Sequence, residues 1–363
     1  MAVRRAVEDV AVVDPGFWRD RRVLVTGQSG FKGTWLTLWL LQLGAHVIGL
    51  SAASPSAPSL YELARVERDV EDFDGDIRDA ERVARVLAES RPEVVLHMAA
   101  QALVRRSFED PRETYEINTM GTVNLLEAVR RHGENVRAVV VVTSDKCYEN
   151  REWEWGYRED EPLGGFDPYS SSKGCAELVT SAFRSSFFAD PDGPRVASAR
   201  AGNVIGGGDW GADRLVPDLM RAALAGEELR VRNPNSVRPW QHVLNPLSGY
   251  LLLAQALCED AACATAWNFG PDERDARTVG WLVERLAEQW PGGLSWSVDE
   301  GPHPHEARWL KLDSSRARQR LGWRPPVEIE QALGSIVGWY HAMGEGVDMR
   351  ALTLEQIEML LVA

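Results

Sequence analysis

Short runs of apolar, mostly β-branched residues alternate with longer stretches of helical period over the first 200 residues. Six runs have the length and composition of buried strands. They cover residues 23–26, 45–50, the neighbourhood of Phe73, 94–98, 138–143 and 196–201. Strands that alternate with helices in this way usually pair in parallel. The pattern therefore predicts an α/β fold with a doubly wound parallel sheet.

After Gly202 the sequence changes to loops rich in Gly, Pro, Asn and Trp, separated by shorter helical patterns such as residues 215–225. An apolar segment at 244–257 has the length of a helix that returns to the main sheet. We therefore expect two domains that exchange chain segments. The larger is predicted from residues 1–202 and 243–267, and a smaller α+β domain from 203–242 and 268–363.

The charge and composition of the chain limit the kinds of molecule that it is expected to bind. The chain has 54 acidic and 40 basic side chains and a net charge of -14, which argues against a nucleic-acid or membrane-surface protein. The first 18 residues contain no apolar leader segment, so a cytoplasmic protein is expected. The four cysteines form no CxxC pair, so we expect reduced thiols and no metal site.

A glycine-rich loop follows the first predicted strand directly. Gly27, Gly30 and Gly33 form a GxxGxxG pattern, with Phe31 and Lys32 between the last two glycines and a helical pattern after them. Glycines allow a tight turn and close approach of a pyrophosphate, while the helix offers free N–H groups. The context predicts a dinucleotide site; the alternative is a glycine turn that binds nothing.

The adenosine end of this site is less clearly marked. Asp76 and Ile77 follow a short predicted strand, where a carboxylate suits the adenine amino group, although an ordinary surface turn reads the same way. The second predicted strand ends in Ser51 and two alanines, without the usual acidic residue for the ribose. Lys32 is the nearest cation. The choice between NAD and NADP is therefore open on these residues.

Two groups of polar residues indicate catalysis. Tyr169 and Lys173 lie four residues apart in a helical pattern, so an ammonium would lie near a phenol and favour its ionisation. Ser144, Asp145 and Lys146 follow a predicted strand at the sheet edge where α/β proteins bind ligands. The alternative is that both groups are ordinary exposed residues, a Tyr–Lys pair on a helix and an Asp–Lys pair in a loop. Because the two groups occur together in one sequence, we favour catalysis.

Several segments together resemble one family. They are GQSGFKGTWL, HMAAQALVRRSFEDPRETYEINTMGTVNLLE, TSDKCYENREWEWGYREDEPLGGFDPYSSSKGCAEL, RAGNVIGGGDWGADRLVPD and NPNSVRPWQHVLNPLSGYLLL. The chain resembles CDP-D-glucose 4,6-dehydratases of the extended short-chain dehydrogenase/reductase group from about residue 17 to residue 340. Ser144-Asp145-Lys146 discriminates best, because dTDP-glucose enzymes carry Asp-Glu there and 4-epimerases generally lack the pair. Gln28 departs from the histidine of this family.

The resemblance implies a Rossmann fold and a three-step reaction. Hydride leaves C4 of the sugar, water is lost across C5 and C6, and hydride returns to C6, giving a 4-keto-6-deoxyhexose. Tyr169 would deprotonate the C4 hydroxyl, Lys173 would lower the pKa of Tyr169 and hold the cofactor ribose, and Ser144 would bond the C4 oxygen. Asp145 would be the acid at C6 and Lys146 the base at C5.

The resemblance also implies binding residues. Ala99 and Ala100 would join the loop residues above at NAD. The nucleotide-diphosphate hexose would contact residues in the substrate loops, namely Gln101, Asn203, Arg214, Arg238 and His305. There are alternatives to a binding role for two of them: Arg214 could be an exposed residue at the start of a helix, and His305 could be an ordinary loop residue. A dinucleotide-binding first domain and a nucleotide-sugar-binding second domain follow.

A homodimer or homotetramer is implied by two long helical patterns, 112–131 and 170–188, which resemble those of a four-helix interface. Leu125, Leu126 and Val129 are the expected apolar contacts. Three other functions stay open: a 4,6-dehydratase of another nucleotide hexose such as dTDP-glucose, a nucleotide-sugar 4-epimerase, and an NAD(P)-sensing binding protein.

Overall fold

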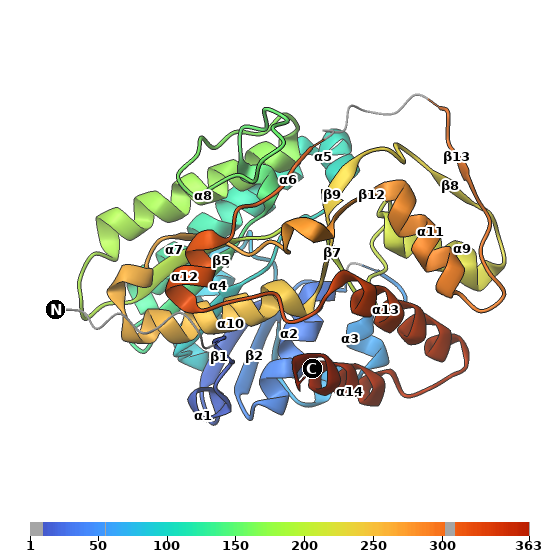
Figure 1. The fold of residues 1–363 in the computed structure, drawn as a ribbon. Coiled ribbons are helices and arrows are strands. Elements are labelled where there is room, and N and C mark those ends of the chain that lie inside the picture. Colours follow the sequence, from blue (N-terminus) through green and yellow to red (C-terminus); the bar gives the residue numbers. More distant parts are fainter. Residues whose placement is uncertain (1–9, 55, 302–308, 363) are drawn as a thin grey trace.

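A computed structural model describes residues 10–54, 56–301 and 309–362 of the chain. Its centre is a seven-stranded parallel sheet with the strand order β11-β6-β5-β4-β1-β2-β3 (Figure 1). The strands are β1 (Arg22–Thr26), β2 (His46–Ser51), β3 (Glu71–Asp74), β4 (Val94–His97), β5 (Ala138–Val142), β6 (Arg195–Arg200) and β11 (Ala266–Asn268). The chain order reverses between β1 and β4, and open α/β sheets bind their ligands outside the carboxyl ends of the strands at such a reversal.

The predicted doubly wound parallel sheet is confirmed, and each of its six predicted strands is present to within about two residues. The seventh strand, β11, was not predicted. Its three residues read Ala-Trp-Asn, too short and too mixed to form an apolar run, and they become a strand by pairing with β6.

Helices cover both faces of the sheet. On one face lie α2 (Phe31–Gln42) and α10 (Leu244–Glu259), and on the other α4 (Ala80–Ser90), α7 (Gly121–His132) and α8 (Pro168–Phe187). Successive strand residues alternate between these layers, as Leu24 belongs to one buried cluster and its neighbours Val23 and Val25 to the other. The helix predicted at 244–257 is confirmed as α10.

The long helical pattern at 112–131 is not one regular helix. It consists of α6 (Pro111–Tyr115), a π-helical turn (Glu116–Met120) and α7. Asp110 caps α6 by accepting a 2.9 Å hydrogen bond from the N–H of Glu113, and Asp167 caps α8 in the same way through Ser170. Pro is the first residue of both helices, where its missing N–H is harmless.

The remaining elements lie mostly beyond the carboxyl ends of the sheet strands (Figure 1). Three two-stranded pairs are β7 (Val204–Ile205) with β10 (Gln241–His242), β9 (Val237–Pro239) with β12 (Ala276–Thr278), and β8 (Leu229–Val231) with β13 (Trp296–Val298). The other α-helices are α1 (Pro15–Trp18), α3 (Leu60–Leu63), α5 (Val104–Glu109), α9 (Leu215–Ala225), α11 (Val279–Gln289), α12 (Ser315–Leu321), α13 (Ile329–Gly344) and α14 (Met349–Val362). Short 3₁₀ turns are Val66–Arg68, Asp145–Cys147, Ala261–Cys263 and Glu273–Asp275. The predicted helix at 215–225 is confirmed, whereas the two domain boundaries remain a prediction.

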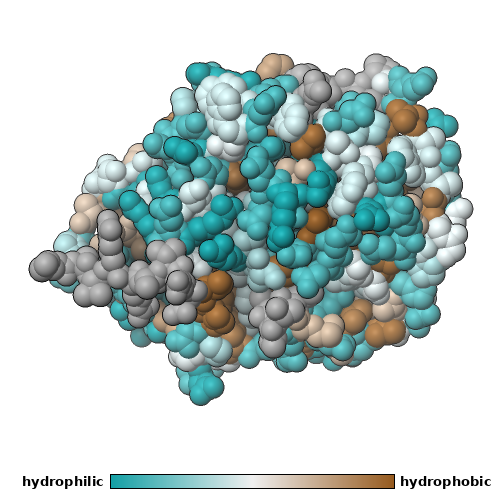
Figure 2. Space-filling model, viewed as in Figure 1, coloured by the Kyte–Doolittle hydropathy of each residue, from teal (hydrophilic) through white to brown (hydrophobic). Residues whose placement is uncertain are grey.

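The face drawn in Figure 2 is mainly hydrophilic, with hydrophobic residues in small separate patches. Across the described ranges, no helix is long and apolar enough to cross a membrane. All four cysteines are free, as predicted, and three of them are buried. Leaving aside the stretches that the structure does not describe, His, Cys, Asp and Glu form no group of three arranged for a metal ion.

Candidate active site

The glycine loop makes a tight turn between β1 and α2. Gly27 has φ +75°, and its N–H donates a 2.8 Å hydrogen bond to the carbonyl oxygen of Leu50. A Cβ on Gly27 would lie 2.8 Å from the backbone nitrogen of Ala99, and one on Gly33 only 2.0 Å from the carbonyl oxygen of Gly27. Side chains are therefore excluded at both positions, and the backbone stays open to a ligand.

This loop fits the pyrophosphate of a dinucleotide. Gly30 is the N-cap of α2 and offers no side-chain cap, so the first N–H groups of the helix keep their positive end for an anion. The N–H of Ala99 is held by the Thr26 hydroxyl at 3.2 Å, which fixes the start of the next loop beside Gly27. The residues that would hold the cofactor here are Gly27, Gly30, Phe31, Gly33, Ala99 and Ala100.

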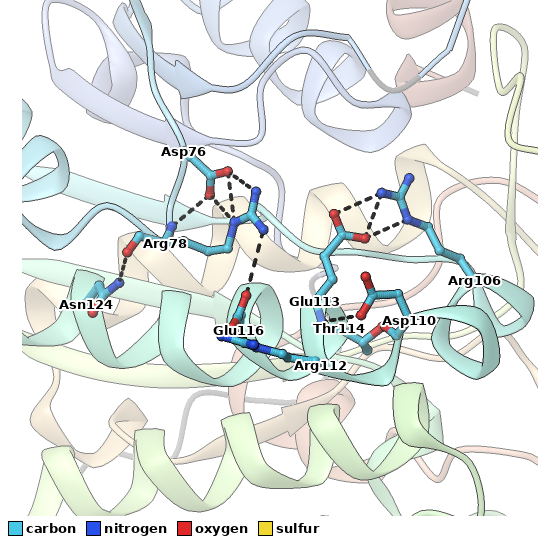
Figure 3. A network of polar contacts seen from close by, with 9 residues as sticks. All are labelled: Asp76, Arg78, Arg106, Asp110, Arg112, Glu113, Thr114, Glu116 and Asn124. Carbon is cyan, nitrogen blue, oxygen red and sulfur yellow. Dashed lines mark hydrogen bonds and ion pairs between the residues drawn. The ribbon is translucent and has the colours of Figure 1, made fainter.

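Asp76 is engaged in an ion pair. Its carboxylate accepts hydrogen bonds of 2.6–3.0 Å from the side chain of Arg78, and this contact lowers the pKa of Asp76 (Figure 3). The carbonyl oxygen of Ile77 accepts a 3.0 Å bond from Asn124. Arg78 also lies 3.9 Å from Glu116 on the π-helical turn. The role of Asp76 and Ile77 at adenine remains a prediction.

Gln28 is buried at the opposite side of the loop, where the resemblance led us to expect histidine. Its amide nitrogen donates a 2.8 Å hydrogen bond to Asp72, and the hydroxyl of Tyr61 donates a 2.7 Å bond to the other oxygen of that carboxylate. The Gln28 side chain also fills the space above Gly49, where a Cβ would lie 2.6 Å from it. Gln28 therefore fills the space between the glycine loop and Gly49 of β2.

Lys32 points toward the catalytic residues. Its Nζ donates a 2.9 Å hydrogen bond to the hydroxyl of Tyr250 on α10. Burial, followed by the positive charges of Lys173 and Arg214, lowers the pKa of Lys32 to about 7, while the nearby Asp145 works in the other direction. These groups belong to the catalytic end, so Lys32 is a poor candidate for an adenosine 2′-phosphate contact.

The basic residues of this chain are mostly arginine. The sequence contains only four lysines, and three of them, Lys32, Lys146 and Lys173, belong to this site. An ammonium is a compact charge whose pKa shifts readily on burial, whereas a guanidinium stays charged. Three of the four amines of the chain therefore lie among the predicted site residues.

The turn after β5 carries the predicted acid and base. Ser144 caps the 3₁₀ turn Asp145–Cys147 by accepting a 3.2 Å hydrogen bond from the N–H of Lys146, and its hydroxyl donates a 3.0 Å bond to Asp145. Burial raises the pKa of Asp145, although the charges of Lys146 and Arg238 oppose this. A carboxyl group with a raised pKa suits the role of a general acid.

Two residues of the next loop complete the pocket of Asp145. The Asn203 amide donates a 3.4 Å hydrogen bond to its Oδ2, and Asn203 adopts a left-handed conformation with φ +48°. A Cβ on Gly202 would lie 1.8 Å from the same oxygen. Asp145 thus occupies the space left free by the missing side chain of Gly202.

Tyr169 and Lys173 lie on the buried face of α8 beside this turn. Burial raises the pKa of Tyr169 to about 12, opposed by a hydrogen bond with Ser144 and by the charge of Arg214. Lys173 Nζ donates a 3.5 Å bond to the carbonyl oxygen of Val142, and burial lowers its pKa to about 8. The structure thus brings the two predicted catalytic groups together.

The residues predicted to bind substrate make different contacts within the protein. Gln101 uses its side chain inside the protein, donating 3.0 Å bonds to the carbonyl oxygen of Leu103 and to the hydroxyl of Thr114 on α6. Arg214 pairs with Asp209 at 3.1 Å. Arg238 and Asn203 act on Asp145, as described above, and His305 lies outside the described residues. Their binding of substrate remains a prediction.

Sequence reasoning missed several residues of this site. Tyr250 lies on an apolar helix with no polar pattern around it. Asn118 links the Gln101 loop to α8 through bonds of 3.0 Å to the Gln101 carbonyl and 2.8 Å to the Ser172 hydroxyl. Glu177 lies four residues after Lys173 in the same helical pattern. This spacing could have predicted that the two side chains are neighbours.

A parallel sheet with a glycine turn at its switch point, and a Tyr–Lys pair beside a strand-end serine, together define a dinucleotide-dependent enzyme of the extended short-chain dehydrogenase/reductase class. The family model described as GDP-mannose 4,6 dehydratase matches residues 24–336. The chain belongs to this family.

Relatives within the family carry related activities. A CDP-glucose 4,6-dehydratase of Salmonella typhimurium is 53% identical over 95% of this chain and 98% of its own length. A UDP-glucose 4-epimerase of Mycolicibacterium smegmatis is 30% identical over 88% of this chain and 98% of its own. A solved dTDP-glucose 4,6-dehydratase of Streptomyces venezuelae, with NAD and TYD bound, has a TM-score of 0.74 and 26% identity, covering 88% of this chain and 97% of that one.

Proposed function

We propose that the protein is an NAD-dependent lyase that converts CDP-D-glucose into CDP-4-keto-6-deoxy-D-glucose. The observation that carries the proposal is the turn Ser144-Asp145-Lys146, whose Ser144 hydrogen-bonds Tyr169 and whose Asp145 lies close enough to affect the pKa of Tyr169. The 53% identity to a CDP-glucose 4,6-dehydratase supports the same substrate. NAD supplies the hydride acceptor and donor for the C4 and C6 steps.

The oxidation step uses the groups on α8 and β5. Tyr169 takes the proton of the C4 hydroxyl, and Ser144 holds the C4 oxygen. Because burial raises the pKa of Tyr169 to about 12, the phenolate needs nearby positive charge. Arg214 provides such charge from the protein side, and we assign the same role to Lys173, which lies four residues after Tyr169 on the same face of α8.

The elimination step uses the turn after β5. Asp145, whose pKa is raised by burial, gives its proton to the departing C6 hydroxyl. Lys146 takes the C5 proton, which the C4 ketone acidifies. The substrate diphosphate binds near Arg214 and Arg238, whose guanidinium groups suit phosphate oxygens. A 4-epimerase reaction includes no loss of water, so Asp145 and Lys146 would have no role in it.

The test is incubation of the purified protein and NAD with CDP-glucose, dTDP-glucose, UDP-glucose and GDP-mannose, with product mass as the readout. We expect the loss of one water from CDP-glucose alone, and no loss with the variant Tyr169→Phe. Loss from dTDP-glucose would change the nucleotide assignment. An unchanged mass with a changed sugar configuration would identify an epimerase, and no change with any sugar would refute the proposal.

A homodimer built on the α7–α8 side is part of the proposal. The predicted contacts Leu125, Leu126 and Val129 were wrong, because all three are buried against the sheet inside this chain. Large apolar side chains that do face outward on this side are Phe108, Tyr115, Met120, Leu178 and Phe187, from 36% to 60% exposed. Light scattering of Leu178→Glu against wild type tests this surface. The predicted cytoplasmic location stays a prediction.

A further inference from the structure

A buried ion pair lies behind the catalytic turn, and the proposed reaction gives it no step. Glu177 on α8 and Arg200 at the end of β6 are 2.7 Å apart, and each side chain is 3% exposed. Removing two charges from water is unfavourable, so such a pair needs close hydrogen-bond partners to be retained.

Glu177 has those partners. It accepts hydrogen bonds from Arg200, from the hydroxyl of Ser198 at 2.7 Å and from the hydroxyl of Thr143. Arg200 in turn donates a 2.7 Å bond to the hydroxyl of Tyr148. Thr143 and Tyr148 stand immediately before and after the residues 144–147. The ion pair therefore holds both ends of the catalytic turn.

Glu177 also continues the row of catalytic residues on α8. Tyr169, Lys173 and Glu177 follow at intervals of four, which places them on one face of the helix. Burial lowers the pKa of Lys173, and the charge of Glu177 works against that effect. Although burial opposes it, Arg200 holds the pKa of Glu177 below its ordinary value, so the carboxylate keeps its charge.

The other titratable groups near this pair do not replace Glu177. Cys147 would also favour a charged Lys173, but burial raises its pKa well above the ordinary value, so the thiol is neutral. Lys32 on α2 can carry positive charge only, and burial keeps His97 on β4 neutral. Arg184 faces Glu177 from the same helix and adds positive charge. Glu177 therefore supplies the negative charge for Lys173.

We propose that Glu177 is a positioning residue for the Tyr169–Lys173 pair, keeping the Lys173 ammonium charged in its buried setting while fixing the end of β5 through Thr143. Arg200 serves this role by holding the carboxylate. The inference rests on the proposed function only for the task of Lys173 in turnover, because the charge of Lys173 can be measured in the cofactor-free protein.

The test compares Glu177→Gln with the double variant Glu177→Gln/Arg200→Met and with the control Ser198→Ala. The double variant also removes the Arg200 guanidinium that Glu177 pairs with, so it gives the comparison if the single variant fails to fold. The control removes one hydrogen bond to Glu177 and keeps its charge. Acetic anhydride acetylates neutral amines, so the labelling rate of Lys173 is followed against pH by peptide mass spectrometry, with Lys311 as the internal reference.

We expect the labelling midpoint of Lys173 to fall by about one pH unit in both Glu177 variants and to stay in place in Ser198→Ala. The alkaline limb of turnover should move in the same direction. An unchanged midpoint in both Glu177 variants would overturn the proposal, even where turnover falls, since a purely structural role predicts that result. Failure of the proposed substrate instead leaves the labelling shift intact and removes wild-type turnover.

Discussion

Gly202 offers a direct test of how Asp145 is placed. Its backbone is not in the left-handed region, so the change Gly202→Ala adds a methyl group without backbone strain. That Cβ would lie 1.8 Å from Asp145 Oδ2, whereas ordinary contact begins at 3.4 Å. The carboxylate must therefore move by about 1.6 Å, away from the hydrogen bonds of Ser144 and Asn203.

The displacement should act on turnover more than on folding. A general acid contributes about 10²–10⁴-fold, and a misplacement of about 1 Å can cost about 10²-fold. We expect turnover to fall by about 10²–10³-fold. The free energy of unfolding should fall by about 1–3 kcal/mol, as for other overpacked sites.

The assay is the rate of water loss from CDP-glucose, followed by mass, together with urea unfolding. The matched control is Gly338→Ala in α13, where the new Cβ meets no heavy atom within 4 Å. We expect the control to keep wild-type turnover and to gain about 0.5–1 kcal/mol of stability, since Ala favours helix over Gly. Wild-type turnover in Gly202→Ala would refute the placement of Asp145 as the acid.

Three further predictions address other parts of the molecule. Lys146→Met should still reduce NAD with CDP-glucose, seen by absorbance, but lose no water; continued water loss would remove Lys146 as the base. Gly33→Ala should abolish NAD binding in calorimetry, because its Cβ would lie 2.0 Å from the Gly27 carbonyl oxygen, and normal affinity would contradict the loop assignment. Burial lowers the pKa of His97 and His242 to about 3, so below pH 6.5 the unfolded chain binds protons that the folded chain does not. The free energy of unfolding should therefore fall by about 2.5 kcal/mol from pH 7 to 5.5 on account of the two, and by about half as much in His242→Asn; an equal fall in the variant would contradict this.

Local patterns were enough to predict the frame of the fold. Buried parallel strands read as continuous apolar runs, so six of the seven strands were found from the sequence. The glycine loop and the Tyr169–Lys173 spacing depend on a few consecutive residues, and their geometry follows from helix and turn rules. These features were predictable because their cause lies within about one helical turn.

Other features depend on residues far apart in the chain. Strand β11 exists because β6 pairs with it, and Lys32 points to the catalytic end because Tyr250, more than 200 residues later, accepts its hydrogen bond at 2.9 Å. Leu125 faces inward because the sheet lies against that side of α7.

The strands, the glycine turn and the types of residue predicted for catalysis thus follow from the amino-acid sequence alone. The electrostatic setting of these residues follows only from the way the chain packs in three dimensions. Asp145 lies in the space left by Gly202, and Lys173 lies beside a carboxylate that is fixed by Arg200. The physical reason is that burial and charge depend on what packs around a group, and the chain brings those neighbours together only when it folds.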